Sequence, residues 1–259
     1  MDILVLVLVS FGASCLTFFS GFGLGTMLTP VFIVLTGGDL VLAMMMTAIV
    51  HFANNVFKFL LMKKSIDWSI ALRFGGIAIP AAALGAYLIS DLEEQVVFAY
   101  ALNGGENEIF LSNLIFGFVL IVFALIELIP KWGFFFAKAN ALIGGLLSGF
   151  FGGLSGHQGA LRTAFLIKFK LSKEAFIATG IVIALVVDIV RTPFYFIEKK
   201  ASLNIDDWLF VGIATGAALT GAIMGKMLLK KIKLKTLNIT VGIAMLVFGI
   251  LLAAGILNR

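Results

Sequence analysis

The sequence consists mostly of long, uninterrupted runs of apolar residues. A helix needs about 20 mainly apolar residues to cross the hydrocarbon core of a membrane. Eight segments reach this length, at residues 3–36, 40–62, 67–90, 111–130, 139–169, 174–197, 206–229 and 236–257. The runs do not alternate between apolar and polar residues, which argues against a transmembrane β-barrel. We therefore expect an all-α polytopic membrane protein with about eight transmembrane helices.

Charged residues are too scarce for a soluble protein of this size. They make up 13% of the 259 residues, against about 25% in soluble domains. This composition excludes nucleic-acid-binding proteins, secreted disulfide scaffolds and disordered chains. Cys15 is the one cysteine, so neither an intramolecular disulfide nor a cysteine metal site can form. We expect a multi-pass protein of the plasma or inner membrane, with no cofactor and no bound nucleic acid.

The basic residues do not decide the direction of insertion. If the eight segments are simple crossings, eight Lys or Arg residues fall on each side, so the positive-inside rule gives a tie. Basic residues are concentrated in the cluster Lys226–Lys235, which favours a cytoplasmic location for that side of the protein. A first segment that turns back as a re-entrant hairpin would change the count. The longest polar stretch, Asp91–Ser112, is expected to be a loop.

The two halves of the chain resemble each other. The sequence Ser20–Gly25 recurs in related form at Ser148–Gly156, each time in the first apolar segment of its half. We expect two homologous transmembrane repeats, at residues 1–130 and 131–259. Many transporters are built from such repeats and bind the substrate between them, near the membrane midplane.

The glycine-rich sequences predict breaks in the first and fifth helices. Irregular backbone at membrane depth is tolerated where it lines a cavity, and a half-helix that begins there directs its N–H groups into that cavity. Two breaks would give two opposed anion-binding helix ends. The alternative is close helix packing through small residues. The substrate-binding residues expected at the breaks are Gly23, Gly25, Thr26, Ser155, His157, Gln158 and Arg162.

Charges inside apolar segments supply the other candidates, because a charge at the bilayer centre is costly and is retained for a reason. Asn55 and Lys58 share a helix face with His51, and Asp188 and Arg191 stand at the same spacing of three in the second half. We expect Asn55, Lys58 and Arg191 to bind an anion. We expect His51 and Asp188 to couple transport to protons, because imidazole titrates near physiological pH.

Each of these assignments has a structural alternative. Lys58 and Arg162 are able to reach the membrane surface along their own long side chains. His51 is equally suited to a hydrogen bond between packed helices. Asp188 and Arg191 could form an ion pair whose role is only structural.

Three further sequence features complete the pattern. Glycine-rich breaks follow Ser20-Gly21 and Ser148-Gly149, Pro30 lies in the first broken segment, and Ile66-Asp67-Trp68 follows the second segment. Over nearly the whole chain, this pattern resembles the TauE/SafE family of sulfite and organosulfonate exporters. The resemblance implies a small sulfur-containing anion as cargo, whereas the buried cations alone indicate only an anion.

These features favour a secondary transporter, and the resemblance favours an exporter. No nucleotide-binding motif is present, so the energy would come from an ion gradient or from the gradient of the anion itself. The expected partners are a small inorganic or organic anion and the lipid bilayer. We expect no enzymatic activity, because two histidines and one cysteine offer no catalytic motif. The alternatives are an anion channel and an intramembrane enzyme of unknown reaction.

Overall fold

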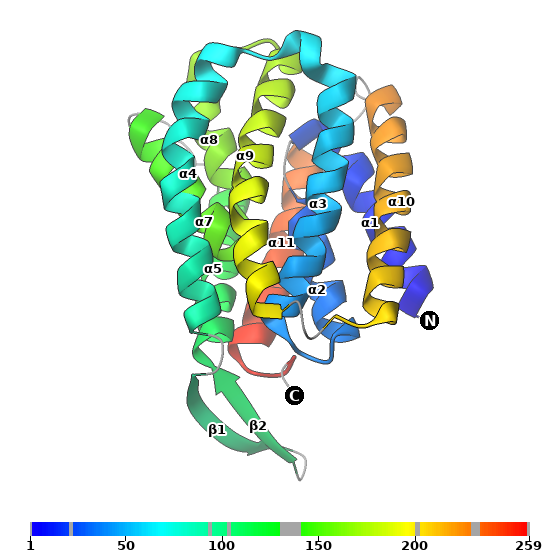
Figure 1. The fold of residues 1–259 in the computed structure, drawn as a ribbon, viewed down its shortest axis with the longest axis vertical. Coiled ribbons are helices and arrows are strands. Elements are labelled where there is room, and N and C mark those ends of the chain that lie inside the picture. The colour runs from blue at the N-terminus through cyan, green and yellow to red at the C-terminus, as the bar shows by residue number, and fades with distance from the viewer. Residues whose placement is uncertain are drawn as a thin grey trace.

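The computed structural model is a bundle of helices with a β-hairpin that projects from one end (Figure 1). It describes residues 2–20, 23–92, 95–102, 105–129, 141–199, 203–228 and 234–257. In chain order the elements are α1 (Asp2–Ser20), α2 (Leu24–Leu35), α3 (Leu40–Met62), η1 (Lys63–Ser65), α4 (Trp68–Asp91), β1 (Val96–Leu102), β2 (Gly105–Phe110), α5 (Leu111–Leu128), α7 (Ala141–Ser155), α8 (Gly159–Leu166), η2 (Ile167–Phe169), α9 (Lys173–Lys199), α10 (Ile205–Leu228) and α11 (Leu234–Ala253).

The helices have the length and composition of membrane helices. In the described part of the chain five of them are long and apolar enough to cross a bilayer, namely α3 continued by η1, α4, α5, α9 and α10. Shorter apolar stretches lie in α1, α2, α7 and α11. Large apolar side chains face outward, such as Leu72 on α4 and Ile197 on α9, which are 68% and 70% exposed. The expected class, a helical integral membrane protein, is confirmed.

The stretch Asp91–Ser112, expected to be a loop, instead contains an antiparallel hairpin of β1 and β2, with a register shift between Val96 and Phe98. The hydroxyl of Tyr100 donates to the carbonyl oxygen of Ala254 at 2.6 Å, which ties the hairpin to the end of α11. The prediction of a loop was wrong because β1 is rich in valine and aromatic residues, and an Asn-Gly dipeptide at residues 103–104 is a strong hairpin signal.

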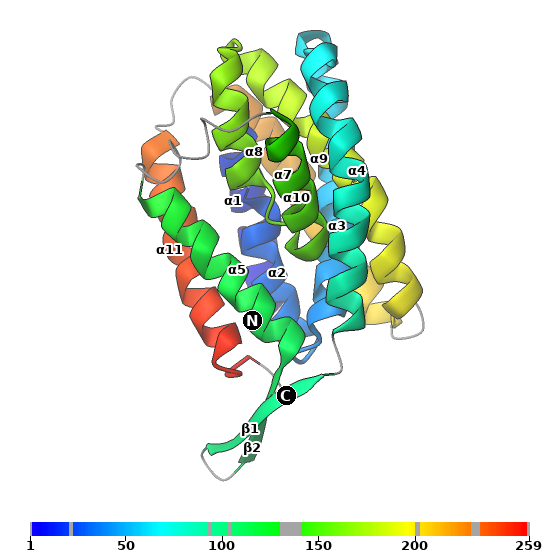
Figure 2. The ribbon, with the colours of Figure 1, turned by 90° about the vertical axis from the view of Figure 1, so that its left-hand side faces the viewer.

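Both glycine-rich segments reverse the direction of the chain. α1 runs parallel to α10, with Phe11 beside Gly221 and Cys15 beside Gly225, and α2 then returns to the end of the bundle where α1 begins (Figure 1). α7 enters from the opposite end and α8 returns to that end (Figure 2). Each pair of short helices therefore begins and ends at one end of the bundle.

The two central helices, α3 and α9, are antiparallel. At one end, Nζ of Lys199 lies 3.1 Å from Oδ2 of Asp39, which caps α3. At the other end, the backbone N–H of Asp67 donates to Oγ1 of Thr179 at 3.0 Å. These contacts place the middle of α3, with His51, against the middle of α9, with Asp188.

Glycine permits the closest helix contacts of the bundle. α4 packs against α7, and α1 packs against α10. A Cβ atom at Gly225 would lie 2.6 Å from the carbonyl oxygen of Cys15, and one at Gly153 would overlap the carbonyl of Ala82. Small residues at such positions let helix backbones approach each other in membranes.

We expect Gly85→Ala to lower the free energy of unfolding by about 1–3 kcal/mol. Its Cβ would lie 2.7 Å from the backbone nitrogen of Leu154 and still closer to the carbonyl oxygen of Phe150. Gly76→Ala on the same helix is the control, because nothing lies within 4 Å of its Cβ position. Thermal unfolding of the purified protein in detergent gives the melting temperature of each variant. Equal melting temperatures would contradict the close contact of Gly85 with α7.

Candidate functional site

The two glycine-rich breaks meet in the interior and border one cavity. At the breaks, Gly23 and Gly156 have φ angles of 111° and 73°, which favour glycine. A Cβ at Gly25 would lie 3.8 Å from the carbonyl oxygen of Gly156, so the breaks lie side by side. The cavity, here called the break cavity, is lined by Gly23, Gly25, Thr26, His51, Gly156, His157, Gln158, Gly159 and Arg162.

The break cavity receives the N-terminal turns of two helices. α2 begins at Leu24 and α8 begins at Gly159, and residues of both first turns line the cavity. The first N–H groups of a helix have no partner within that helix and carry its positive end, so they favour an anion. Arg162, in the first turn of α8, adds a guanidinium and is 2% exposed. It lies inside the bundle, which removes the alternative that it reaches the membrane surface.

His157 and Gln158 place further polar groups beside this cavity. Nδ1 of His157 donates to the carbonyl oxygen of Ser155 at 2.5 Å, and its ring packs edge-on against Phe116 at a centroid distance of 5.2 Å. Nε2 of His157 and Nε2 of Gln158 are buried without a hydrogen-bond partner among the residues that the structure describes. Ser155, the last residue of α7, is not among the residues that line the cavity. Its hydroxyl donates to the carbonyl oxygen of Phe151 at 2.9 Å.

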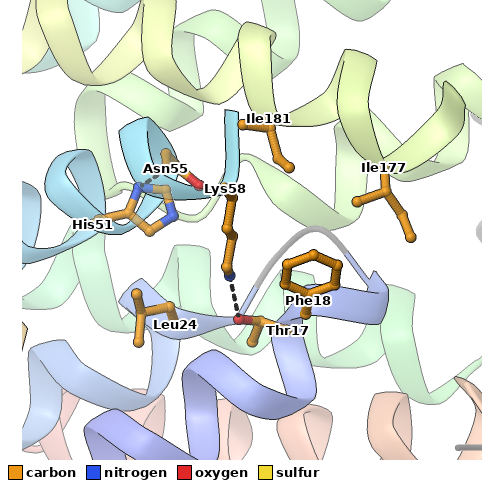
Figure 3. A pocket seen from close by; sticks show the side chains of 8 residues that line it. All are labelled: Thr17, Phe18, Leu24, His51, Asn55, Lys58, Ile177 and Ile181. Carbon is orange, nitrogen blue, oxygen red and sulfur yellow. Dashed lines mark hydrogen bonds between the residues drawn. The ribbon is translucent and has the colours of Figure 1, made fainter. Parts of the chain in front are cut away.

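A second cavity lies around Lys58. This lysine cavity is lined by Thr17, Phe18, Leu24, His51, Asn55, Lys58, Ile177 and Ile181 (Figure 3). Nζ of Lys58 donates to Oγ1 of Thr17 at 3.4 Å and lies 5.7 Å from the centre of the Phe18 ring. With its amide oriented to satisfy both of its groups, Asn54 accepts from Nζ at 3.0 Å. Lys58 is 4% exposed, so its ammonium group does not reach the membrane surface.

His51 lines both cavities and is held by a carboxylate. Its Nδ1 lies 2.6 Å from Oδ2 of Asp188, which also accepts from the amide of Asn55 at 3.2 Å. Because a carboxylate only accepts, Nδ1 carries the proton and donates it. The pair joins the middle of α3 to the middle of α9, so a hydrogen bond between packed helices is present at His51.

Arg191, expected to bind the anion, lines neither of these two cavities. Its Nε donates to Oδ1 of Asp188 at 3.0 Å, and its Nη2 lies 2.9 Å from the same oxygen. This is the ion pair that a spacing of three residues permits, and it was the alternative to anion binding by Arg191. A Cβ at Gly156 would overlap Nη1 of Arg191, so the guanidinium also packs against the second break.

Sequence reasoning missed Thr17 and Phe18 as lining residues of the lysine cavity. The available signal was weak: Thr17 is a polar residue inside an apolar run, three positions before Ser20. Phe18 gives no signal, because phenylalanine is frequent along the whole chain. Within the residues that the structure covers, no group of three His, Cys, Asp or Glu side chains is placed to hold a metal ion.

Comparison with known proteins gives a family assignment. Neither the curated proteins nor the solved structures include a significant match. The family model described as sulfite exporter TauE/SafE matches residues 6–252, which is nearly the whole chain. Members of this family are membrane transporters that export sulfur-containing anions. The chain therefore belongs to the TauE/SafE family of sulfite exporters.

Proposed function

We propose that the protein is a secondary transporter that exports a small sulfur-containing anion, such as sulfite or an organosulfonate, through the break cavity. The observation that carries this proposal is the convergence of the first turns of α2 and α8 with the buried guanidinium of Arg162 on one cavity. Helix N-termini and arginine both suit the oxygen atoms of a small oxyanion, the arginine by paired hydrogen bonds.

The balance of buried charges supports an anionic cargo. Asp188 is paired with Arg191, so these two charges compensate each other. Lys58 and Arg162 are further buried cations, and each lines one of the two cavities. Positive charge inside a medium of low dielectric constant attracts anions and repels cations. We assign the lysine cavity, with Asn55 and Lys58, as a second position on the anion path.

His51 is the proposed point of proton coupling. It borders both cavities, and Asp188 holds its ring in one orientation. A proton taken up by His51 would add one positive charge between two anion positions. In His51→Gln we expect anion flux to persist but to lose its response to a pH gradient, measured in proteoliposomes. A response equal to that of the unaltered protein would remove His51 from this role.

The contacts also support a division into two inverted repeats, at residues 1–130 and 131–259. α3 and α9, which form the second apolar segment of each half, are antiparallel. The first helix of each half packs against the third apolar segment of the other half, so that α1 packs against α10 and α7 packs against α4. This exchange of equivalent partners is expected of a pseudo-two-fold relationship in the membrane plane.

The reversals at the breaks remove the tie in the positive-inside count. When both broken segments return to the end from which they started, eight basic residues of the described helices and turns lie at one end of the bundle, and Lys199 alone lies at the other. The eight are Lys63, Lys64, Arg73, Lys168, Lys170, Lys173, Lys226 and Lys235. We propose that this end is cytoplasmic, with the hairpin of β1 and β2 outside.

Single-cysteine labelling tests this orientation. Cys15, which is buried, is first replaced by serine. A membrane-impermeant maleimide should then label Val97→Cys on the hairpin in intact cells, because Val97 is exposed. It should label Ser172→Cys, an exposed position between η2 and α9, only after the membrane is opened. The reverse pattern would invert the proposed orientation.

Ligand-induced stabilisation tests the proposed function on the purified protein. A ligand at a hundred times its Kd stabilises the folded state by about 2.7 kcal/mol. We expect sulfite, or one of thiosulfate and sulfoacetate, to raise the melting temperature in detergent, and sodium chloride at equal ionic strength to leave it unchanged. If none of the sulfur anions shifts the melting temperature, the assignment of the cavity fails.

A further inference from the structure

Two buried nitrogen atoms beside the break cavity have no hydrogen-bond partner in the described part of the chain, and they differ in chemistry. Nε2 of Gln158 is an amide nitrogen and can only donate, while its Oε1 accepts from Ser148 at 3.5 Å. Nε2 of His157 is the other atom. Both residues line the cavity and are at most 3% exposed. A buried polar atom without a partner costs about 1–3 kcal/mol, so a ligand that satisfies both atoms is favoured.

The neighbour of His157 determines which of its ring nitrogens carries the proton. Nδ1 lies 2.5 Å from the carbonyl oxygen of Ser155, and a carbonyl can only accept. Nδ1 is therefore the donor, and in the neutral ring Nε2 is left as an acceptor. The lining of the cavity thus contains one unsatisfied acceptor and one unsatisfied donor.

An anion with acceptors alone does not match this arrangement. The oxygens of sulfite dianion or of a sulfonate can accept from Gln158, from Arg162 and from the helix N-termini. They cannot donate to Nε2 of His157, and two acceptors that face each other away from water are unfavourable. A singly protonated oxyanion presents acceptor oxygens and one hydroxyl, and so satisfies both sides.

We propose that the break cavity recognises its oxyanion in the singly protonated form, whose hydroxyl donates to Nε2 of His157. The inference rests on the proposed function and narrows its substrate class to oxyanions that keep one proton near neutral pH. The charged and titratable groups around His157 are His51 of α3, Arg162 of α8, and the pair Asp188 and Arg191 of α9. Of these, Arg162 lines the cavity and meets the negative charge of the ligand, and Nε2 of His157 accepts from its hydroxyl.

Two anions of equal charge test the inference on the full chain in detergent by calorimetric titration. Hydrogensulfite carries a titratable proton, whereas methanesulfonate is a monoanion without one. We expect hydrogensulfite to bind about tenfold more tightly. The affinity for total sulfite should fall as the pH rises through its second ionisation, and that for methanesulfonate should stay constant. In His157→Phe, which keeps a ring against Phe116, sulfite should lose its advantage and methanesulfonate should bind as before.

Three results would overturn the inference. Equal affinity for the two anions would show that the hydroxyl is not recognised, and would leave the proposed function standing. A methanesulfonate affinity that falls with rising pH would show that a protonated His157 acts as a donor. Absence of binding by either anion would overturn the inference together with the proposed function. If His157→Phe does not fold, the comparison of the two anions on the unaltered protein still decides.

Discussion

Replacing Arg162 by alanine is expected to reduce sulfur-anion flux in proteoliposomes by about tenfold to a hundredfold. Arg162 is buried in the first turn of α8 and lines the break cavity, so its loss removes the charge-assisted hydrogen bonds that we propose it donates to the anion. Arg162→Lys keeps the charge and loses the paired geometry, and should give an intermediate flux.

The matched control is Arg73→Ala, which removes an exposed arginine from α4. It should leave flux unchanged at equal protein incorporation. Melting curves of all three variants separate a loss of binding from a loss of folding. Normal flux by a folded Arg162→Ala protein would remove Arg162 from the anion path.

Asp188→Asn is expected to lower the free energy of unfolding by about 3–5 kcal/mol, the usual effect of breaking one partner of a buried ion pair. Asp188 is fully buried and accepts from His51, Asn55 and Arg191. The substitution leaves the guanidinium of Arg191, 2% exposed, without its counter-charge. Thermal and denaturant unfolding in detergent measure the change.

Two further variants test the explanation. Asp188→Asn combined with Arg191→Gln should recover part of the lost stability, because the uncompensated charge is also removed. Asp39→Asn breaks a more exposed pair, with Lys199, and should cost about 0–1 kcal/mol. If Asp188→Asn were as stable as Asp39→Asn, the buried pair of Asp188 and Arg191 would not stabilise the fold.

The helical membrane class and the approximate positions of the long apolar helices could be predicted from the sequence. Continuous apolar runs set the lengths of α3, α4, α9 and α10, because a membrane helix must satisfy its own backbone groups. The recurrence of a glycine-rich sequence indicated that Gly25 and Gly156 belong to matched breaks. The structure brings them together, with Arg162 beside them.

Other features depend on contacts between distant segments and could not be predicted in this way. The reversal of the chain at each break follows from packing of α1 on α10 and of α7 on α4. The partner of Arg191 was also undecided, since a spacing of three permits an ion pair but does not require one. The hairpin is a different case, because its signals, the valine and aromatic content of β1 and the Asn-Gly dipeptide, are present in the sequence and were not used.

The central claim is that this chain moves a small sulfur oxyanion across a membrane. The most direct measurement is sulfite efflux from proteoliposomes that contain the unaltered protein, with and without an imposed pH gradient and with protein-free liposomes as the control. The account predicts sulfite flux well above the control, with a rate that changes with the pH gradient. Efflux equal to that of protein-free liposomes, for sulfite and for thiosulfate and sulfoacetate alike, would contradict it.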